Sequence, residues 1–230
     1  MSIGSLISTI ATLAMLLVIG YGAGKLKYVD EVSTERLSTL IVKIGQPFLI
    51  INGLISQEYS RENLMTGLKI LLLGLCMHTF MALIAYLCAR PIKPFDEQKL
   101  SEYSMFLANC GFIGFPIVET LFGSEGLFYG AFYIVSFHLF VWTWGVMILA
   151  RKREDIKLTP KKIVFNFGTM PCLIGFVLYA ANIPLPDFGY QLASYLAAIC
   201  TPISIIISGA NIARRSLKKM LTNKNVYAVN

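Results

Sequence analysis

Charged residues are scarce in this sequence. Only 14% of its 230 residues are Asp, Glu, Lys or Arg, whereas hydrophobic residues make up 56%. A soluble domain carries roughly 25% charged residues, because water must solvate its surface. The low charge therefore excludes an ordinary soluble domain, and the high apolar content excludes a disordered chain. The lipid bilayer remains as the solvent for most of the chain.

Cysteine pairs and enzyme signatures are also missing. The sequence has no HExxH, no glycine-rich phosphate loop with a lysine and no Gly-x-Ser-x-Gly, so we expect no enzyme activity and no cofactor. The cysteines are odd in number, lack CxxC spacing and lie in or beside apolar runs, which favours inert buried thiols over disulfides or a metal site. They are Cys76, Cys88, Cys110, Cys172 and Cys200.

Long apolar runs are what the sequence does contain. A membrane-spanning helix needs about 20 mostly apolar residues, and seven stretches qualify: residues 3–26, 37–55, 64–89, 103–122, 126–150, 163–183 and 188–213. We therefore predict an all-α membrane protein. The net charge of +7 comes from basic clusters between these runs, so it indicates loops on one side of a membrane rather than a nucleic-acid partner.

The distribution of basic residues predicts the orientation. Seventeen of the 20 Lys and Arg residues follow the first, third, fifth or seventh apolar run. Because cytoplasmic loops are enriched in Lys and Arg, we expect a multi-pass protein of the cell (plasma) membrane with its N-terminus outside and its C-terminus in the cytoplasm. The first run is not a cleavable signal peptide, because its charges, Lys25 and Lys27, come after it.

Related residues recur at a spacing of 155. The pairs are Gly20 with Gly175, Leu37 with Leu192, Pro47 with Pro202, and Ile50-Ile51 with Ile205-Ile206. A repeat unit of five spans would place its second copy in the membrane with inverted orientation, as in many secondary transporters. We therefore divide the chain into a first five-helix repeat (1–150), a basic cytoplasmic loop (151–162), the first two helices of a second repeat (163–213) and a basic cytoplasmic tail (214–230).

The fourth apolar run contains residues that disfavour a helix. Asn109, Gly111, Gly114 and Pro116 lie in its middle, where proline removes a backbone donor and glycine costs roughly 1 kcal/mol. We expect unwound backbone around residues 110–115, with a half-helix that starts near Pro116 and directs its positive end at an anion. The alternative is a kinked structural helix whose small residues allow close packing.

The same stretch resembles a known family. The runs ANCGFIGFPIVETLFGSEGLFYGAFY, WTWG and TPISIIISGANIA are similar to those of bacterial auxin efflux carriers, and the resemblance covers essentially the whole chain. It implies ten helices in two inverted five-helix repeats, with two broken helices crossing at the centre. It also implies transport of organic anions, with malate and other dicarboxylates as typical bacterial substrates and auxin as the plant one.

Carried over by position, the resemblance assigns Asn109, Gly111, Gly114 and Pro116 to the first crossing helix. It assigns Pro47 and Pro202 to the prolines of the second and seventh helices. Two departures stand out. Adding 155 to the fourth run gives 258–277, which exceeds 230, so the chain looks truncated after its seventh helix and lacks the second crossing helix. His138 also stands where a neutral polar residue is expected.

Further polar residues are candidates for the site. Gln46 and Asn52 flank Pro47, and Thr201, with Ser204 and Ser208, surrounds Pro202. These groups suit a carboxylate or its coupling ion, or they satisfy backbone groups that proline leaves free. His138 is a candidate for proton coupling, because an unperturbed histidine titrates near physiological pH, or it is a hydrogen-bonded structural group. Together with the fourth run, the predicted substrate-binding residues are Gln46, Pro47, Asn52, Asn109, Cys110, Gly111, Gly114, Pro116, Thr201 and Pro202.

Three interpretations of function follow. The first is a secondary active transporter of a small organic anion, either a malate-like carboxylate or an auxin-like acid, coupled to H⁺ or Na⁺. The second is a seven-helix receptor or sensor, which fits the number of runs and the orientation. The third is a truncated fragment without transport activity. The broken fourth run and the 155-residue repeat favour the first, with the lipid bilayer and a homodimer partner as neighbours.

The orientation yields a first testable prediction. Single cysteines placed at Lys157 and Asp187, in a background without native cysteines, should differ in labelling by a membrane-impermeant thiol reagent applied to intact cells. The Asp187→Cys protein should be labelled and the Lys157→Cys protein should not, because basic loops stay in the cytoplasm. Labelling after membrane permeabilisation is the control, and the reverse pattern in intact cells would overturn the orientation.

Overall fold

The computed structural model describes residues 3–107, 109–151, 165, 166 and 168–215. All regular structure in this part of the chain is helical, which confirms the all-α prediction. Nearly all of the predicted basic loop 151–162, and residues 216–230 of the predicted tail, lie outside the described residues.

Within the described part of the chain, five helical segments are long and apolar enough to cross a membrane. They are Ile3–Lys25, Glu31–Leu54, Arg61–Ala89, Phe95–Ala150 and Asp187–Arg214, joined by a shorter apolar helix, Thr169–Ala180. Their elements are α1 (Ile3–Lys25), α2 (Glu31–Leu40), η1 (Ile41–Gly45), α3 (Gln46–Leu54), α4 (Arg61–Ala89), α5 (Phe95–Phe106), η2 (Cys110–Gly114), α6 (Phe115–Phe140), η3 (Val141–Gly145), α7 (Val146–Ala150), α9 (Thr169–Ala180), α10 (Asp187–Ala198) and α11 (Cys200–Arg214). The three η elements are π-helical turns.

The long segment Phe95–Ala150 reverses direction at Gly123. This residue has φ +63° and ψ −146° inside α6, a conformation that glycine adopts without steric cost. The two arms of α6 then pack against each other, since a methyl group built on Gly130 would lie 3.1 Å from the Phe115 ring. The reversal lies where the sequence predicts the end of its fourth apolar run and the start of its fifth.

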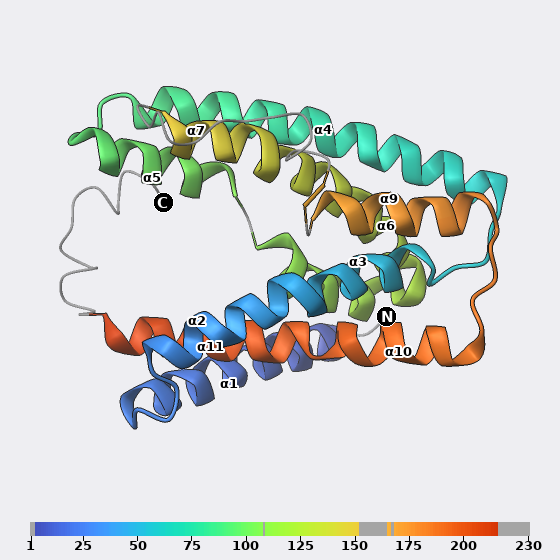
Figure 1. Ribbon diagram of the computed structural model, residues 1–230, viewed down its shortest axis with the longest axis horizontal. Helices are drawn as coiled ribbons and strands as arrows, with labels where there is room; N and C mark the ends of the chain where they lie inside the picture. Colours follow the sequence, from blue (N-terminus) through green and yellow to red (C-terminus); the bar gives the residue numbers. More distant parts are fainter. Residues whose placement is uncertain (1–2, 108, 152–164, 167, 216–230) are drawn as a thin grey trace.

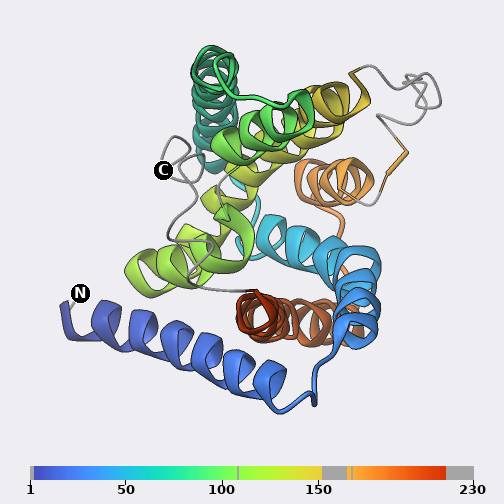
Figure 2. The ribbon, with the colours of Figure 1, turned by 90° about the vertical axis from the view of Figure 1, so that its left-hand side faces the viewer.

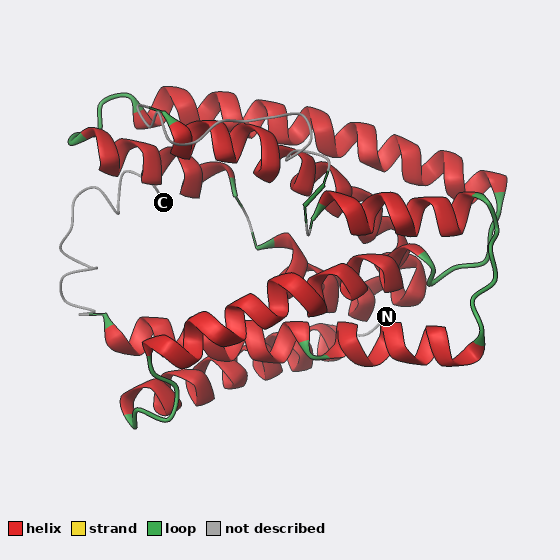
Figure 3. Cartoon of the chain, viewed as in Figure 1, coloured by secondary structure: helices red, strands yellow, loops and turns green. Residues whose placement is uncertain are grey.

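The helices form two groups (Figure 1). One contains α1, α2, α3, α10 and α11, and the other contains α4, α5, α6 and α7. The turned view in Figure 2 shows the same separation, with α3 and α9 between the outer helices. A buried apolar cluster joins the groups through α3, α6 and α9, and its members are Ile50, Leu54, Phe115, Phe128, Ala131, Phe132, Ile134, Cys172 and Tyr179. Helices account for almost all of the described chain (Figure 3).

Two helix ends share one turn structure at the 155-residue spacing. Among the residues that the structure describes, Lys27 (φ 61°) and Asn182 (φ 50°) are the only non-glycine residues with positive φ. Each ends its helix with the pair of backbone hydrogen bonds typical of a Schellman motif. These bonds are Lys27 N–H to Gly24 O and Tyr28 N–H to Ala23 O after α1, and Asn182 N–H to Tyr179 O and Ile183 N–H to Leu178 O after α9.

Helix crossings repeat at the same spacing. A methyl group built on Gly20 of α1 would lie 2.7 Å from the Ile206 Cα of α11, and one built on Gly175 of α9 would lie 3.3 Å from the Ile51 Cα of α3. Gly175 follows Gly20 by 155 residues, and Ile206 follows Ile51 by 155 residues. The contact of α1 with α11 therefore corresponds to the contact of α9 with α3.

In one pair at this spacing, the two residues contact each other. Gly45 and Cys200 differ by 155, and a methyl group built on Gly45 would lie 2.5 Å from the Cys200 Sγ. Both residues stand just before an X-Pro step, at Pro47 and at Pro202. The two long proline-containing segments therefore meet each other at equivalent points.

A buried ion pair closes one end of the second group of helices. Glu102 of α5 has no exposed surface, and the Arg151 guanidinium at the end of α7 donates to both of its carboxylate oxygens, at 2.8 Å for Oε1. Arg151 also lies over the Tyr86 ring of α4, 5.5 Å from the ring centre. The arginine that sequence analysis assigned to a cytoplasmic loop thus connects three helices.

The cysteine prediction is only partly correct. Cys172 and Cys200 are buried, but Cys76 and Cys88 of α4 are exposed, although all five cysteines are free thiols. The cause is that α4 presents much of its apolar surface outward, including Leu72 at 62% exposure. Such a surface suits lipid, because apolar side chains gain nothing from turning inward when the solvent is itself apolar.

The crossing of α1 and α11 generates a matched stability prediction. A methyl group on Gly24 would lie 2.8 Å from the Ala210 Cα, whereas one on Gly22 meets nothing within 4 Å. Gly24→Ala should therefore destabilise the protein by about 1–3 kcal/mol, and Gly22→Ala, two residues away in the same helix, should not. Thermal unfolding in detergent measures both, and equal melting temperatures for the two variants would contradict the close crossing.

Candidate functional site

The helix that precedes the site ends at Phe106, and the backbone leaves the helical conformation at Leu107 and at Asn109. Leu107 is extended, with φ −102° and ψ 105°, and Asn109 has φ −79° and ψ 61°. The chain winds again from Cys110 as η2 and continues into α6. The prediction of unwound backbone at 110–115 is therefore wrong in position, because the glycines and the proline lie in the new helix rather than in the break.

Asn109 is the reason that the helix can restart at this point. Its side-chain Oδ1 accepts the Phe112 N–H at 3.1 Å, which caps the first turn as an N-cap asparagine does. Pro116 follows two residues after η2 ends, and the π-helical turn before it takes up the distortion that a proline inside a helix causes. Between them, η2 takes up one extra residue per turn, and the Gly114 N–H donates to the Asn109 carbonyl at 3.3 Å.

The second proline-containing segment uses the same local solution. The turn η1 ends at Gly45, two residues before Pro47, just as η2 ends at Gly114, two residues before Pro116. Here the segment Glu31–Leu54 is wound throughout and has no break. A π-helical turn accommodates the proline within the helix, which avoids unpaired backbone groups in an apolar medium.

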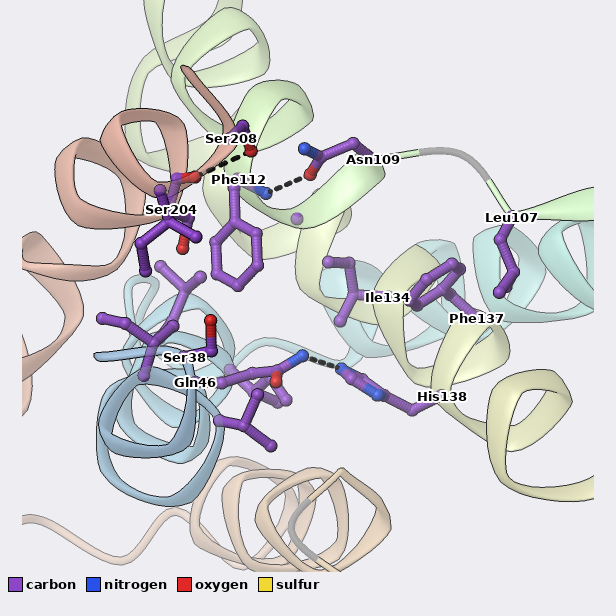
Figure 4. A pocket seen from close by; sticks show the side chains of 16 residues that line it. Ser38, Gln46, Leu107, Asn109, Phe112, Ile134, Phe137, His138, Ser204 and Ser208 are labelled. Atoms are coloured by element: carbon purple, nitrogen blue, oxygen red, sulfur yellow. Dashed lines mark hydrogen bonds between the residues drawn. The ribbon is translucent and has the colours of Figure 1, made fainter. Parts of the chain in front are cut away.

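A pocket of about 420 Å³, called the central pocket below, lies beside the restarted helix, between the two helix groups (Figure 4). Four predicted site residues line it, namely Gln46, Asn109, Gly111 and His138, together with the α11 serines Ser204 and Ser208. The remaining lining residues are Ser38, Ile41, Val42, Leu49, Ile50, Leu107, Phe112, Ile134, Phe137 and Ile207. The pocket is thus largely apolar, with neutral polar groups contributed by α2, α3, η2 and α11.

His138 contacts the other helix group through one hydrogen bond. It is 3% exposed, and the Gln46 amide N–H donates to its Nε2 at 3.1 Å (Figure 4). Because Nε2 accepts this bond, the proton of the neutral imidazole resides on Nδ1. Nδ1 is buried and has no hydrogen-bond partner among the described residues, and a methyl group built on Gly168 would lie 2.6 Å from it.

The other predicted site residues lie elsewhere. Cys110 and Gly114 line a second pocket of about 480 Å³, together with residues of α4 and α6. Five residues line neither of these two pockets: Pro47, Asn52, Pro116, Thr201 and Pro202. Pro47 and Asn52 belong to α3, and Thr201 and Pro202 to the first turn of α11. Their role in binding stays a prediction.

Ser38 and Phe112 are among the lining residues that sequence analysis did not propose. Ser38 and Val42 precede Gln46 at intervals of four, which places all three on one helix face, so helical spacing could have found Ser38. Phe112 lies inside the Asn-x-Gly-Phe stretch and projects into the pocket (Figure 4). The motif that contains Phe112 could have indicated it, but only the glycines and the proline of that motif have a direct effect on the backbone.

Comparison with known proteins agrees with this architecture. A family described as membrane transport protein matches residues 5–229. An uncharacterized transporter of Methanothermobacter thermautotrophicus is 25% identical over 226 residues, which cover 96% of this chain and 72% of the relative. An uncharacterized transporter of Methanocaldococcus jannaschii is 22% identical over 211 residues, covering 89% of this chain and 68% of the relative.

The family match extends over nearly the whole chain, both relatives are transporters by name, and the fold supplies several apolar helices that can cross a membrane. The family is one of transporters and not of enzymes. The chain therefore belongs to the membrane transport protein family, the family of the auxin efflux carriers.

Proposed function

We propose that this protein is a secondary active transporter that carries a small organic anion, either a malate-like carboxylate or an auxin-like acid, through the cell membrane. One observation carries the proposal. The helix that restarts at Cys110 begins at the wall of the central pocket, with Asn109 and Gly111 lining that wall. The N-terminus of a helix presents unpaired N–H groups and a positive partial charge, which favour an anion.

The pocket matches the size and the polarity that such a substrate needs. About 420 Å³ lies within the range of small-molecule sites. Amide and hydroxyl groups of Gln46, Ser38 and Ser204 can orient a carboxylate, while Phe112 and Phe137 offer apolar surface to the rest of the molecule. Coupling to a gradient of H⁺ or Na⁺ supplies the driving force in this proposal.

The contacts at the 155-residue spacing support an inverted repeat. A two-fold relation between residues 1–150 and 163–213 accounts for these contacts. It turns the Gly20–Ile206 contact into the Gly175–Ile51 contact and places Gly45 against its equivalent, Cys200. In inverted-repeat transporters the substrate site lies near the middle of the membrane, where one group of helices moves against the other. The pocket here lies between two such groups.

The alternatives are a receptor or sensor and a fragment without transport activity. A receptor needs neither the interrupted helix nor the repeated contacts, and the family match favours transport. Experiment separates all three. Purified protein should bind radiolabelled malate or indole acetate, and liposomes containing it should accumulate the same compound under an imposed gradient. Binding without uptake would support the fragment, and the absence of both binding and uptake would overturn the proposal.

Substitutions of Asn109 test the anion site itself. Asn109→Asp keeps an oxygen that accepts the Phe112 N–H but adds a negative charge at the helix N-terminus. Anion binding should fall by about tenfold or more, while the melting temperature stays close to that of the unmodified protein.

The controls for this prediction separate charge from capping. Asn109→Ser retains a capping oxygen without charge, so it should bind the anion better than Asn109→Asp. Asn109→Ala should lose about 1 kcal/mol of stability because the cap is gone. Equilibrium binding of labelled malate measures the effect, and an Asn109→Asp protein that binds malate as tightly as the unmodified protein would contradict the assignment.

A further inference from the structure

The central pocket has one titratable side chain. Among the residues that line it, all of which are described, none is Lys, Arg, Asp or Glu, and His138 is the only side chain that can take up a proton to become positive. An anion that enters this pocket therefore meets amide and hydroxyl dipoles but no fixed counter-charge. Burying an unpaired charge is expensive, so a group that becomes positive beside it has a large effect on binding.

The geometry of His138 suits a change of protonation. In the neutral form its Nε2 accepts the Gln46 amide N–H, so a second proton at Nε2 removes this bond. The Gln46 side chain must then either turn its carbonyl oxygen to the imidazolium or leave it. In the second case the amide N–H of Gln46 and the Nε2–H of His138 both become donors for a carboxylate in the pocket.

Other titratable groups on the helices around His138 have different surroundings. On α4, the His78 Nδ1–H donates to the Gly74 carbonyl at 2.7 Å, and Lys69 is exposed. On η1, Lys43 is exposed. Cys172 of α9 donates to the Gly168 carbonyl. No other titratable side chain on the described helices lines the pocket, including Glu31, Glu35 and Arg36 of α2 and Cys110 of η2.

We propose that His138 takes up one proton with each anion, and that the anion and the proton cross the membrane together. This inference rests on the proposed function and names H⁺, not Na⁺, as the coupling ion. The proton comes from the aqueous side on which the anion binds, resides on Nε2 while the pocket is occupied, and leaves with the anion on the other side. The Gln46–His138 bond marks the empty, unprotonated state.

The proposal specifies which anions move without charge. A monocarboxylate and one proton carry no net charge, so uptake of pyruvate into proteoliposomes should not respond to membrane potential. Malate with one proton carries one negative charge, so an inside-positive potential set with K⁺ and valinomycin should accelerate its uptake.

The first test follows the proton directly. The chain contains two histidines, so ¹⁵N-histidine labelling yields two sets of imidazole signals, and His78→Gln leaves only those of His138. Saturating malate at pH 7.5 should convert the His138 signals from neutral imidazole to imidazolium. Signals that remain those of a neutral ring, while malate binds, would overturn the proposal without affecting the proposed function.

The second test measures linkage between proton and anion. If one proton binds with the anion, the Kd for malate rises by up to about tenfold for each pH unit above neutrality. The His138→Gln protein should bind malate more weakly at pH 6.5 and lose this pH dependence, and the His138→Asn protein should do the same. His78→Gln, which lies outside the pocket, should keep the dependence.

The outcomes separate the two claims. A pH-independent Kd in the unmodified protein overturns proton coupling and leaves anion transport standing. An unchanged pH dependence in both His138 variants assigns the proton to another group and overturns the role of His138. No binding of malate, pyruvate or indole acetate at any pH refutes the proposed function itself.

Discussion

A peptide group inside a bilayer has no water to bond with, and this constraint determines how the chain can depart from a regular helix. At each irregular point, groups close by in the sequence adjust the backbone hydrogen bonding. Asn109 caps the helix that restarts after the interruption, and π-helical turns at Ile41–Gly45 and Cys110–Gly114 precede the two prolines. Leu107 and Asn109, where the helix is interrupted, line the central pocket, so structural necessity and the proposed site coincide.

Close approach between helices is the second determinant. Gly20 and Gly24 bring the backbones of α1 and α11 together, and Gly45 leaves room for the Cys200 side chain. These close contacts define one group of helices. The other group is held by the Glu102–Arg151 pair and by aromatic packing around Phe128 and Phe132. Hydrogen bonds between the groups link Gln46 to His138 and Thr9 to Thr120. Each is a bond between neutral groups, which contributes only about 1 kcal/mol.

Much of this architecture is predictable from the sequence, for reasons that differ between its parts. Hydropathy locates the helices because the solvent is apolar throughout their length, and the turn at Gly123 follows from the gap between two runs. The interruption was misplaced by several residues because glycine and proline indicate an irregularity without indicating which side of them unwinds. The Gln46–His138 contact joins residues 92 apart, and no local pattern encodes it.

The packing of α1 has a consequence for how the protein is made. Its main neighbour is α11, and the crossing at Gly20 and Ile206 joins residues that are far apart in the chain. At 5–20 residues per second, roughly 10–40 s separate their synthesis on the ribosome. During this interval α1 is inserted without its partner, and its glycine face must be tolerated by lipid or shielded by an insertion factor. Biogenesis thus places a demand on α1 that the finished structure no longer reveals.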